Sequence, residues 1–172
     1  NDILKFLDLN KEYLDVTALK SYYLLILLMT GKDDKYFFEL KDLLLEDKAD
    51  LSYLEKFNLI SVLRNYAHRK LNEGNTDFKE SILEVTRYSI DKDILSNTEH
   101  GRYISETRFM NLIWTANLSE ESEWFEEFIK KFKNRIEPDK RQYVLAYCYG
   151  VLEFKRGNYS GALEKLGKSG PI

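Results

Sequence analysis

The sequence has few of the residues that cross-link or break a chain: one cysteine, two prolines and eight glycines in 172 residues. The single Cys148 cannot form an internal disulfide, which excludes a disulfide-stapled secreted scaffold and favours a reducing compartment such as the cytoplasm. β-Sandwiches need many turns and use more glycine and proline to build them. The scarcity of both residues therefore favours long helices with few breaks.

Charge of one sign and long apolar runs are also scarce. The net charge is −3, whereas a generic nucleic-acid-binding protein is usually basic, so no nucleic-acid partner is expected. The longest apolar run, Tyr22–Met29, has eight residues, against the roughly 20 that a membrane helix needs. No membrane partner is expected either. The chain starts at Asn1 rather than at an initiator methionine, and we expect it to be a fragment of a longer protein.

Motifs of the common catalytic sites are absent. The sequence contains no G-x-S-x-G, G-x-x-x-x-G-K-[ST], H-E-x-x-H or C-x-x-C. Two histidines, His68 and His100, and one cysteine are a poor inventory for zinc. Cys148 lies between two tyrosines and is expected to pack as a small hydrophobe. We therefore expect no enzymatic activity, no cofactor and no metal.

Helical periodicity is present nearly everywhere. Apolar residues recur at three- and four-residue steps, for example at Phe125, Phe128, Ile129, Phe132 and Ile136. No segment alternates with period two over six or more residues, so no sheet is expected. Caps and breaks predict helices over 11–30 (capped by Asn10), 35–46, 51–72 (capped by Asp50), 77–89 (capped by Thr76), 99–116, 120–136 (capped by Ser119), 138–155 and 159–165, with a short extra helix near 2–7.

The predicted helices form pairs. The turn inside each pair lies near Gly31, Gly74, Leu118 or Gly157, so the pairs recur about every 40 residues. A constant period in an all-helical chain is typical of an α-solenoid. The prediction is an all-α fold, a solenoid of about four antiparallel pairs (11–46, 50–90, 98–136 and 138–168) forming one domain over 1–172. Further repeats are expected beyond the last residue.

The last pair resembles a tetratricopeptide repeat. Gly150 and Ala162 fit the places where a small residue of the first helix packs against a small residue of the second. Gly157 fits the turn glycine, and Tyr159 fits the aromatic residue that follows it. Two helices can cross closely only where side chains are small, and the turn needs a residue that tolerates positive φ. The resemblance implies a right-handed superhelix.

The other pairs keep less of the pattern. The second pair fits with Ala67, Gly74, Phe78 and Ser81 if two residues are inserted in the turn. The first and third pairs have large residues where a small one belongs. The repeats are also longer than the family's usual length of about 34 residues, so the resemblance is to a tetratricopeptide-like array.

Such arrays usually bind an extended peptide or a partner helix in a groove lined by the first helix of each pair. Carried over to this chain, groove positions are Arg64, His68 and Arg108, with Asn65 beside them and Tyr147 in the fourth pair. Two arginines at matching positions would suit carboxylates. The alternatives are that both arginines pair with carboxylates of neighbouring helices, or that the groove is apolar.

The resemblance implies a non-enzymatic scaffold that binds another protein or a peptide. The alternative is a regulatory or sensor segment of a larger protein, such as a transcriptional regulator, whose activity lies outside this chain. An apolar face exposed at the end of an array also allows self-association.

Overall fold

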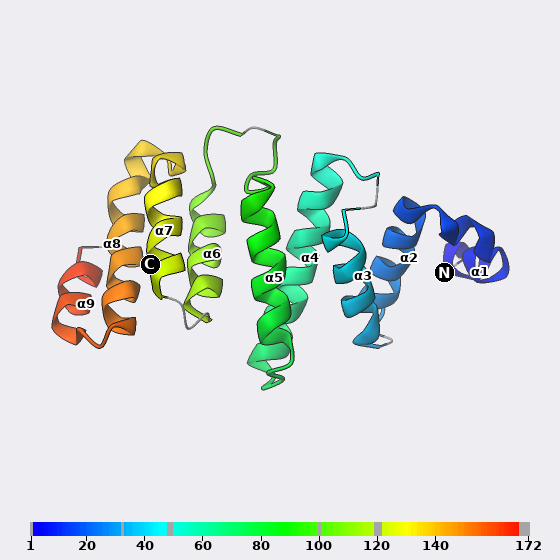
Figure 1. Ribbon diagram of the computed structural model, residues 1–172, viewed down its shortest axis with the longest axis horizontal. Helices are drawn as coiled ribbons and strands as arrows, with labels where there is room; N and C mark the ends of the chain where they lie inside the picture. Colours follow the sequence, from blue (N-terminus) through cyan, green and yellow to red (C-terminus); the bar gives the residue numbers. More distant parts are fainter. Residues whose placement is uncertain (1, 32, 48–49, 100, 119–121, 169–172) are drawn as a thin grey trace. The chain divides into compact units, whose positions relative to one another are not determined.

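The computed structural model describes residues 2–31, 33–47, 50–99, 101–118 and 122–168, with the side chain of Ser122 left out. The described residues contain helices and no strand, which confirms the all-α prediction (Figure 1). None of these helices is both long enough and apolar enough to cross a membrane. In chain order the elements are α1 (Asp2–Leu9), the 3₁₀ segment η1 (Lys11–Asp15), α2 (Thr17–Met29), α3 (Lys35–Leu45), α4 (Tyr53–Asn72), α5 (Phe78–Asp91), α6 (Glu106–Leu118), α7 (Ser122–Phe132), the 3₁₀ segment η2 (Lys133–Arg135), α8 (Pro138–Lys155) and α9 (Tyr159–Leu166).

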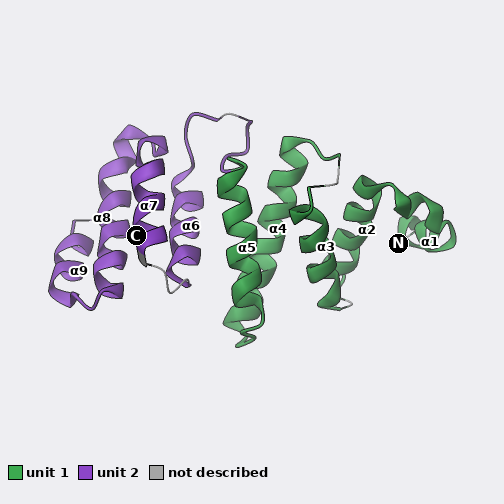
Figure 2. Cartoon of the chain, viewed as in Figure 1, with its two compact units in different colours: residues 1–94 green, residues 95–172 purple. Residues whose placement is uncertain are grey.

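The chain divides into two compact units, residues 1–94 and 95–172 (Figure 2). In unit 1, α2 packs on α3 and α4 packs on α5, while α3 also contacts both α4 and α5. In unit 2, α6 and α7 contact each other and both contact α8, which packs on α9. The residues of the predicted pairs 11–46 and 50–90 lie in unit 1, and those of the predicted pairs 98–136 and 138–168 lie in unit 2.

Three of the predicted turns contain a glycine in the left-handed region. The φ angles of Gly31, Gly74 and Gly157 are +69°, +90° and +78°. At Gly74 the chain closes α4 with two backbone hydrogen bonds, from Gly74 N to Leu71 O at 3.0 Å and from Asn75 N to Lys70 O at 2.9 Å. This pattern satisfies two carbonyls at the helix end and requires positive φ at the glycine.

The first predicted helix is wrong at its start, because Asn10 does not cap it. The Asn10 side chain donates to the Phe6 carbonyl at 2.7 Å and so closes the end of α1 instead. Residues 11–15 form a 3₁₀ segment, Val16 is extended with φ −78° and ψ 108°, and α2 begins only at Thr17. A side chain that satisfies the preceding helix is not available to cap the next one.

Three other starts differ from their predictions. The cap of α4 is Ser52, not Asp50, and it forms a capping box with Glu55. The N-cap position of α5 is Asp77, not Thr76, and its side chain makes no capping hydrogen bond. The first helix of the third pair was expected to begin at residue 99, but α6 begins at Glu106. The segment before it is tied to η2 instead, since Ile104 N donates to Arg135 O at 2.8 Å and the Arg135 guanidinium donates to Gly101 O at 2.9 Å. The predicted cap Ser119 lies outside the described residues.

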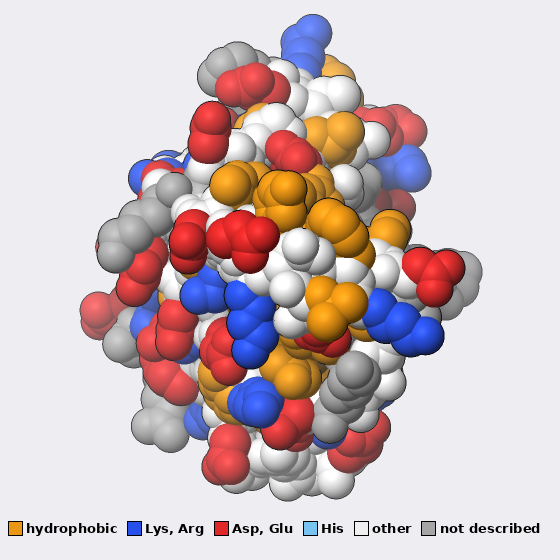
Figure 3. Space-filling model, turned by 90° about the vertical axis from the view of Figure 1, so that its right-hand side faces the viewer, with side chains coloured by type: hydrophobic (Ala, Val, Ile, Leu, Met, Phe, Trp, Pro, Cys, Tyr) orange, Lys and Arg blue, Asp and Glu red, His pale blue; other side chains and the backbone are white. Residues whose placement is uncertain are grey.

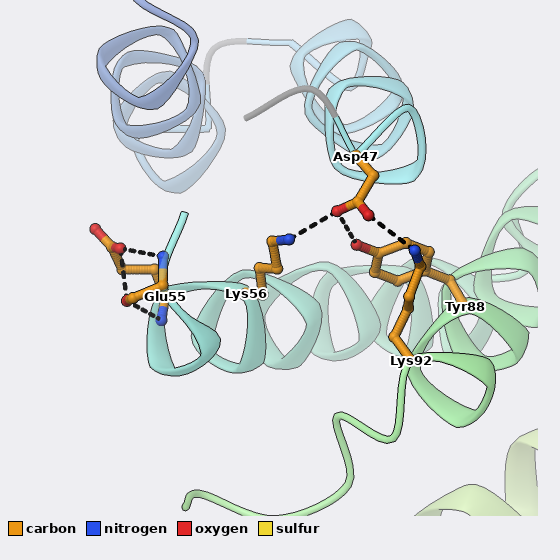
Figure 4. A network of polar contacts seen from close by, with 6 residues as sticks. Asp47, Glu55, Lys56, Tyr88 and Lys92 are labelled. Carbon is orange, nitrogen blue, oxygen red and sulfur yellow. Dashed lines mark hydrogen bonds and ion pairs between the residues drawn. The ribbon is translucent and has the colours of Figure 1, made fainter. Parts of the chain in front are cut away.

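Asp47 connects three parts of unit 1 (Figure 4). Its carboxylate accepts hydrogen bonds from Lys56 Nζ at 2.7 Å, from the Tyr88 hydroxyl at 2.9 Å and from Lys92 Nζ at 2.8 Å. These donors, Lys56 first, lower the pKa of Asp47 well below its usual range. The segment after α3 is thereby fixed to both α4 and α5.

Candidate functional site

A concavity lies between α2 and α4 in unit 1. Its volume is about 360 Å³, and the described residues that line it are Leu28, Met29, Gly31, Val62, Asn65, Tyr66 and Arg69. The first three come from the end of α2 and its turn, and the other four come from α4. These two helices are the first members of the two predicted pairs in this unit.

The α2 side of the concavity is apolar. Leu28 is only 2% exposed and forms the floor, whereas the neighbouring Met29 is 71% exposed at the rim. Gly31 continues this wall, and no atom beyond its two chain neighbours lies within 4 Å of the position that a Cβ would take there. Near the middle of α2, the Tyr22 hydroxyl donates to Glu55 of α4. This bond joins the two helices that form the concavity.

The α4 side presents one face of a helix. Val62, Asn65, Tyr66 and Arg69 follow one another along α4 at the three- and four-residue steps that place side chains on one face of a helix. Asn65 and Arg69 are exposed, while Val62 and Tyr66 are half-buried. The face therefore combines an aliphatic group, an amide, an aromatic ring and a guanidinium.

The Tyr66 ring is held from two sides. It stacks on Phe37 with ring centres 5.6 Å apart and an interplanar angle of 20°. Its hydroxyl donates to Asp34, whose carboxylate also pairs with Lys70 at 2.8 Å. Lys70 and then Tyr66 lower the pKa of Asp34, and burial followed by the bond to Asp34 raises the pKa of Tyr66. Asp34 is thus charged and compensated at neutral pH.

Arg69 lies against this ring. Its guanidinium carbon is 4.8 Å from the ring centre of Tyr66, within the range of a cation–π contact. Arg69 Nε also lies 3.9 Å from a carboxylate oxygen of Glu73, and both side chains are more than half exposed. Exposed pairs of this kind contribute little free energy. Arg69 therefore keeps hydrogen-bonding capacity at the rim.

Of the groove residues expected in the second pair, only Asn65 is among the described residues that line the concavity. Arg64 is 3% exposed, so the structure does not present it at a surface. His68 is half-buried, and burial, followed by the charge of Arg64, lowers its pKa to about 4. The expected groove positions on α4 were Arg64 and His68, whereas the concavity is lined by the residues that follow each of them, Asn65 and Arg69.

Sequence reasoning missed Val62, Tyr66 and Arg69. A signal for them was present: with Asn65 they follow helical spacing, and a tyrosine lies three residues before an arginine. The expected residues of the other two pairs belong to unit 2, where Arg108 of α6 and Tyr147 of α8 are both half-buried.

The residues expected at the helix crossings lie as follows. Ala67 of α4 and Ser81 of α5 are 0% and 6% exposed, and Ala162 of α9 is 2% exposed. A Cβ on Gly150 would lie 2.7 Å from Leu166 Cγ and 3.4 Å from the Ala162 carbonyl oxygen, so α8 and α9 approach closely there. Tyr159 is 63% exposed and packs edge-on against Phe154, with ring centres 5.5 Å apart.

Two further observations concern metal ligands and the single thiol. No group of three or more His, Cys, Asp and Glu side chains there could hold a metal ion. Cys148 is buried, and burial raises the pKa of its thiol to about 12, so the thiolate is not populated at neutral pH.

A second apolar surface lies at the α1 end of unit 1, which faces the viewer in Figure 3. Ile3, Phe6 and Leu9 of α1 are 60%, 53% and 85% exposed, and Tyr13 of η1 packs on Phe6 with ring centres 5.7 Å apart. Self-association through an apolar face stays a prediction.

No protein-family model, curated protein or solved structure matches this chain. The candidate site is thus defined by the chain's own residues: an apolar floor, a tyrosine ring held in place, and an amide and a guanidinium at the rim.

Proposed function

We propose that the chain is a non-enzymatic interaction module that binds a peptide segment of a partner protein in the concavity between α2 and α4. The observation that carries this proposal is the combination of an apolar floor with polar groups at the rim, lined by the first helices of two successive pairs. A small number of well-placed polar groups around an apolar surface is the usual make-up of a binding pocket.

The size and chemistry of the concavity fit a peptide. A volume of about 360 Å³ accommodates one or two large side chains, and burying one apolar side chain stabilises a complex by about 1.5–3 kcal/mol. The exposed amide of Asn65 can both donate to and accept from a peptide backbone. Met29 is exposed and flexible, so it can adapt its shape to a bound side chain.

The helix pairing supports the wider part of the proposal, a tetratricopeptide-like scaffold in the cytoplasm. Consecutive helices pack together in α2–α3, α4–α5 and α8–α9, and each of these pairs has a glycine with positive φ in its turn. In such a scaffold, partners bind along the first helices.

Peptides selected from a random 12-residue display library test the proposal. Met29→Lys places a charge at the rim of the concavity and should weaken binding of the selected peptides about tenfold or more, because the apolar contact is lost. Leu163→Lys is the matched control, since Leu163 of α9 is also apolar and 73% exposed. Both variants are checked for folding by circular dichroism. If no peptide is selected, or if Met29→Lys and Leu163→Lys bind alike, the proposal fails.

A further inference from the structure

We infer that the peptide bound in this concavity carries an aspartate or glutamate about three residues from an apolar side chain, and that Arg69 recognises its carboxylate. The inference rests on the proposed function and deepens it, because it assigns the charge and the spacing of the ligand. The partner is accordingly an acidic–apolar segment of a protein chain.

The charge at the concavity supports an acidic ligand. Arg69 is the one charged residue among the described residues that line it. Asp34, which accepts from the Tyr66 hydroxyl, is already compensated by Lys70 at 2.8 Å. Glu73 also lies 3.9 Å from Arg69 in a largely exposed pair, so a ligand carboxylate that displaces it binds a positive charge, whereas a cationic ligand would meet repulsion from Arg69.

Arg69 is also held in a suitable position. Its guanidinium lies 4.8 Å from the Tyr66 ring centre, and that ring is fixed by Phe37 and Asp34. A stacked guanidinium loses less conformational freedom when it binds, and its planar fork matches a carboxylate with two parallel hydrogen bonds. The competing carboxylate of Glu73 lies 3.9 Å away in a largely exposed pair, so a ligand can displace it at small cost.

The spacing follows from the geometry of α4. Val62, on the apolar part of the site, precedes Arg69 by seven residues, which is about 10 Å along a helix. An extended peptide covers that distance with about three residues. Asn65 lies between the two positions and faces the backbone of the bound segment. A chain terminus is usually captured by several converging backbone donors, so we commit to a side-chain carboxylate within a segment.

Display selection on the wild-type chain and on two charge-reversed variants tests the inference. Arg69→Glu reverses the charge at the site. Arg102→Glu is the matched control, because Arg102 is also exposed and also lies over a tyrosine, 5.1 Å from the Tyr103 ring centre. The wild type and the control should enrich Asp or Glu about three residues from Leu, Met or Phe. Arg69→Glu should instead enrich Lys or Arg at that position.

A selected peptide is then synthesised in three forms: with its acidic residue, with the corresponding amide, and with an amidated C-terminus. The amide form should bind the wild type about tenfold more weakly than the acidic form does. The Arg69→Gln variant should bind the acidic and the amide forms equally. Amidation of the C-terminus should leave the affinity for the wild type unchanged.

The inference is overturned if Met29→Lys abolishes binding but the selected peptides lack the acidic residue; the proposed function then stands. It is also overturned if C-terminal amidation causes the loss, or if a single-stranded oligonucleotide binds and Arg69→Glu removes that binding. If Met29→Lys changes the affinity of no selected peptide, both the proposed function and the inference about Arg69 are wrong.

Discussion

The Arg69 guanidinium lies over the Tyr66 ring, 4.8 Å from its centre, while the hydroxyl of the same tyrosine donates to Asp34. One side chain thus has two separable functions: its ring positions a cation at the surface, and its hydroxyl joins α4 to the start of α3. Substitutions can remove either function alone.

Tyr66→Phe should lower stability without changing peptide binding. The variant loses the bond to Asp34, at a cost of about 1 kcal/mol in urea unfolding, but keeps the ring beneath Arg69. Tyr66→Leu should also weaken binding of a selected acidic peptide several-fold in fluorescence anisotropy, because a cation–π contact contributes roughly 0.5–1 kcal/mol at an exposed site. Equal affinity of the Leu variant and the wild type would contradict the role of the ring.

Asp47→Asn should destabilise unit 1 in a pH-dependent way. Its three donors lower the pKa of Asp47 in the folded state, so the stabilisation is fully present above the unfolded-state pKa of about 3.9 and is lost as the pH falls below it. The difference in unfolding free energy between wild type and variant should therefore be largest near pH 7 and shrink toward pH 2.5. Asparagine is chosen because it tolerates positive φ, which is +52° at Asp47.

Asp93→Asn is the control for this prediction, because Asp93 also has positive φ, at +54°. It makes the same change of charge and shape at the same kind of backbone position. A difference between wild type and Asp47→Asn that stays constant from pH 7 to pH 2.5 would show that the donors around Asp47 do not supply the effect.

Gly150→Ala should destabilise the packing of α9 on α8. The added Cβ would lie 2.7 Å from Leu166 Cγ and 2.8 Å from Leu166 Cδ2, which forces that side chain to move and costs about 1 kcal/mol or more. This loss exceeds the gain in helix propensity from replacing glycine. Hydrogen exchange should quicken in residues 159–166. The double variant Gly150→Ala, Leu166→Ala should lose less than the sum of the single changes, and strict additivity would exclude the clash.

His68 should make the folded state less stable as the medium becomes acidic. Its pKa is lowered to about 4 in the folded chain, chiefly by burial, while the unfolded chain keeps a pKa of about 6.5. The unfolded state therefore binds a proton first, and stability falls as the pH decreases from 6.5 to 4. His68→Gln should flatten this part of the stability profile, measured by urea unfolding at half-unit pH steps. If the unfolding free energy of His68→Gln fell with pH as steeply as that of the wild type, His68 would not be the group responsible.

Much of the local structure could be predicted because it depends on adjacent residues. Gly74 and Gly157 follow the ends of their helices because glycine tolerates the positive φ of these turns. Pro138 begins α8 because its missing N–H is not needed in the first turn of a helix. The errors have local causes of another kind. Asn10 lies between two helical segments, and its side chain hydrogen-bonds to the end of the first one. Ile104 hydrogen-bonds to the backbone of Arg135 instead of joining α6.

The sequence by itself determined that the chain is helical, where several helices turn and that one cysteine is buried, since periodicity and backbone preferences are short-range properties. Only the tertiary structure decided which face of α4 meets α2. Each residue is a rotation of about 100° around a helix, so the orientation set by packing decides whether Arg64 or Arg69 reaches the surface. Packing buried the first and left the second over Tyr66, at the rim of the concavity.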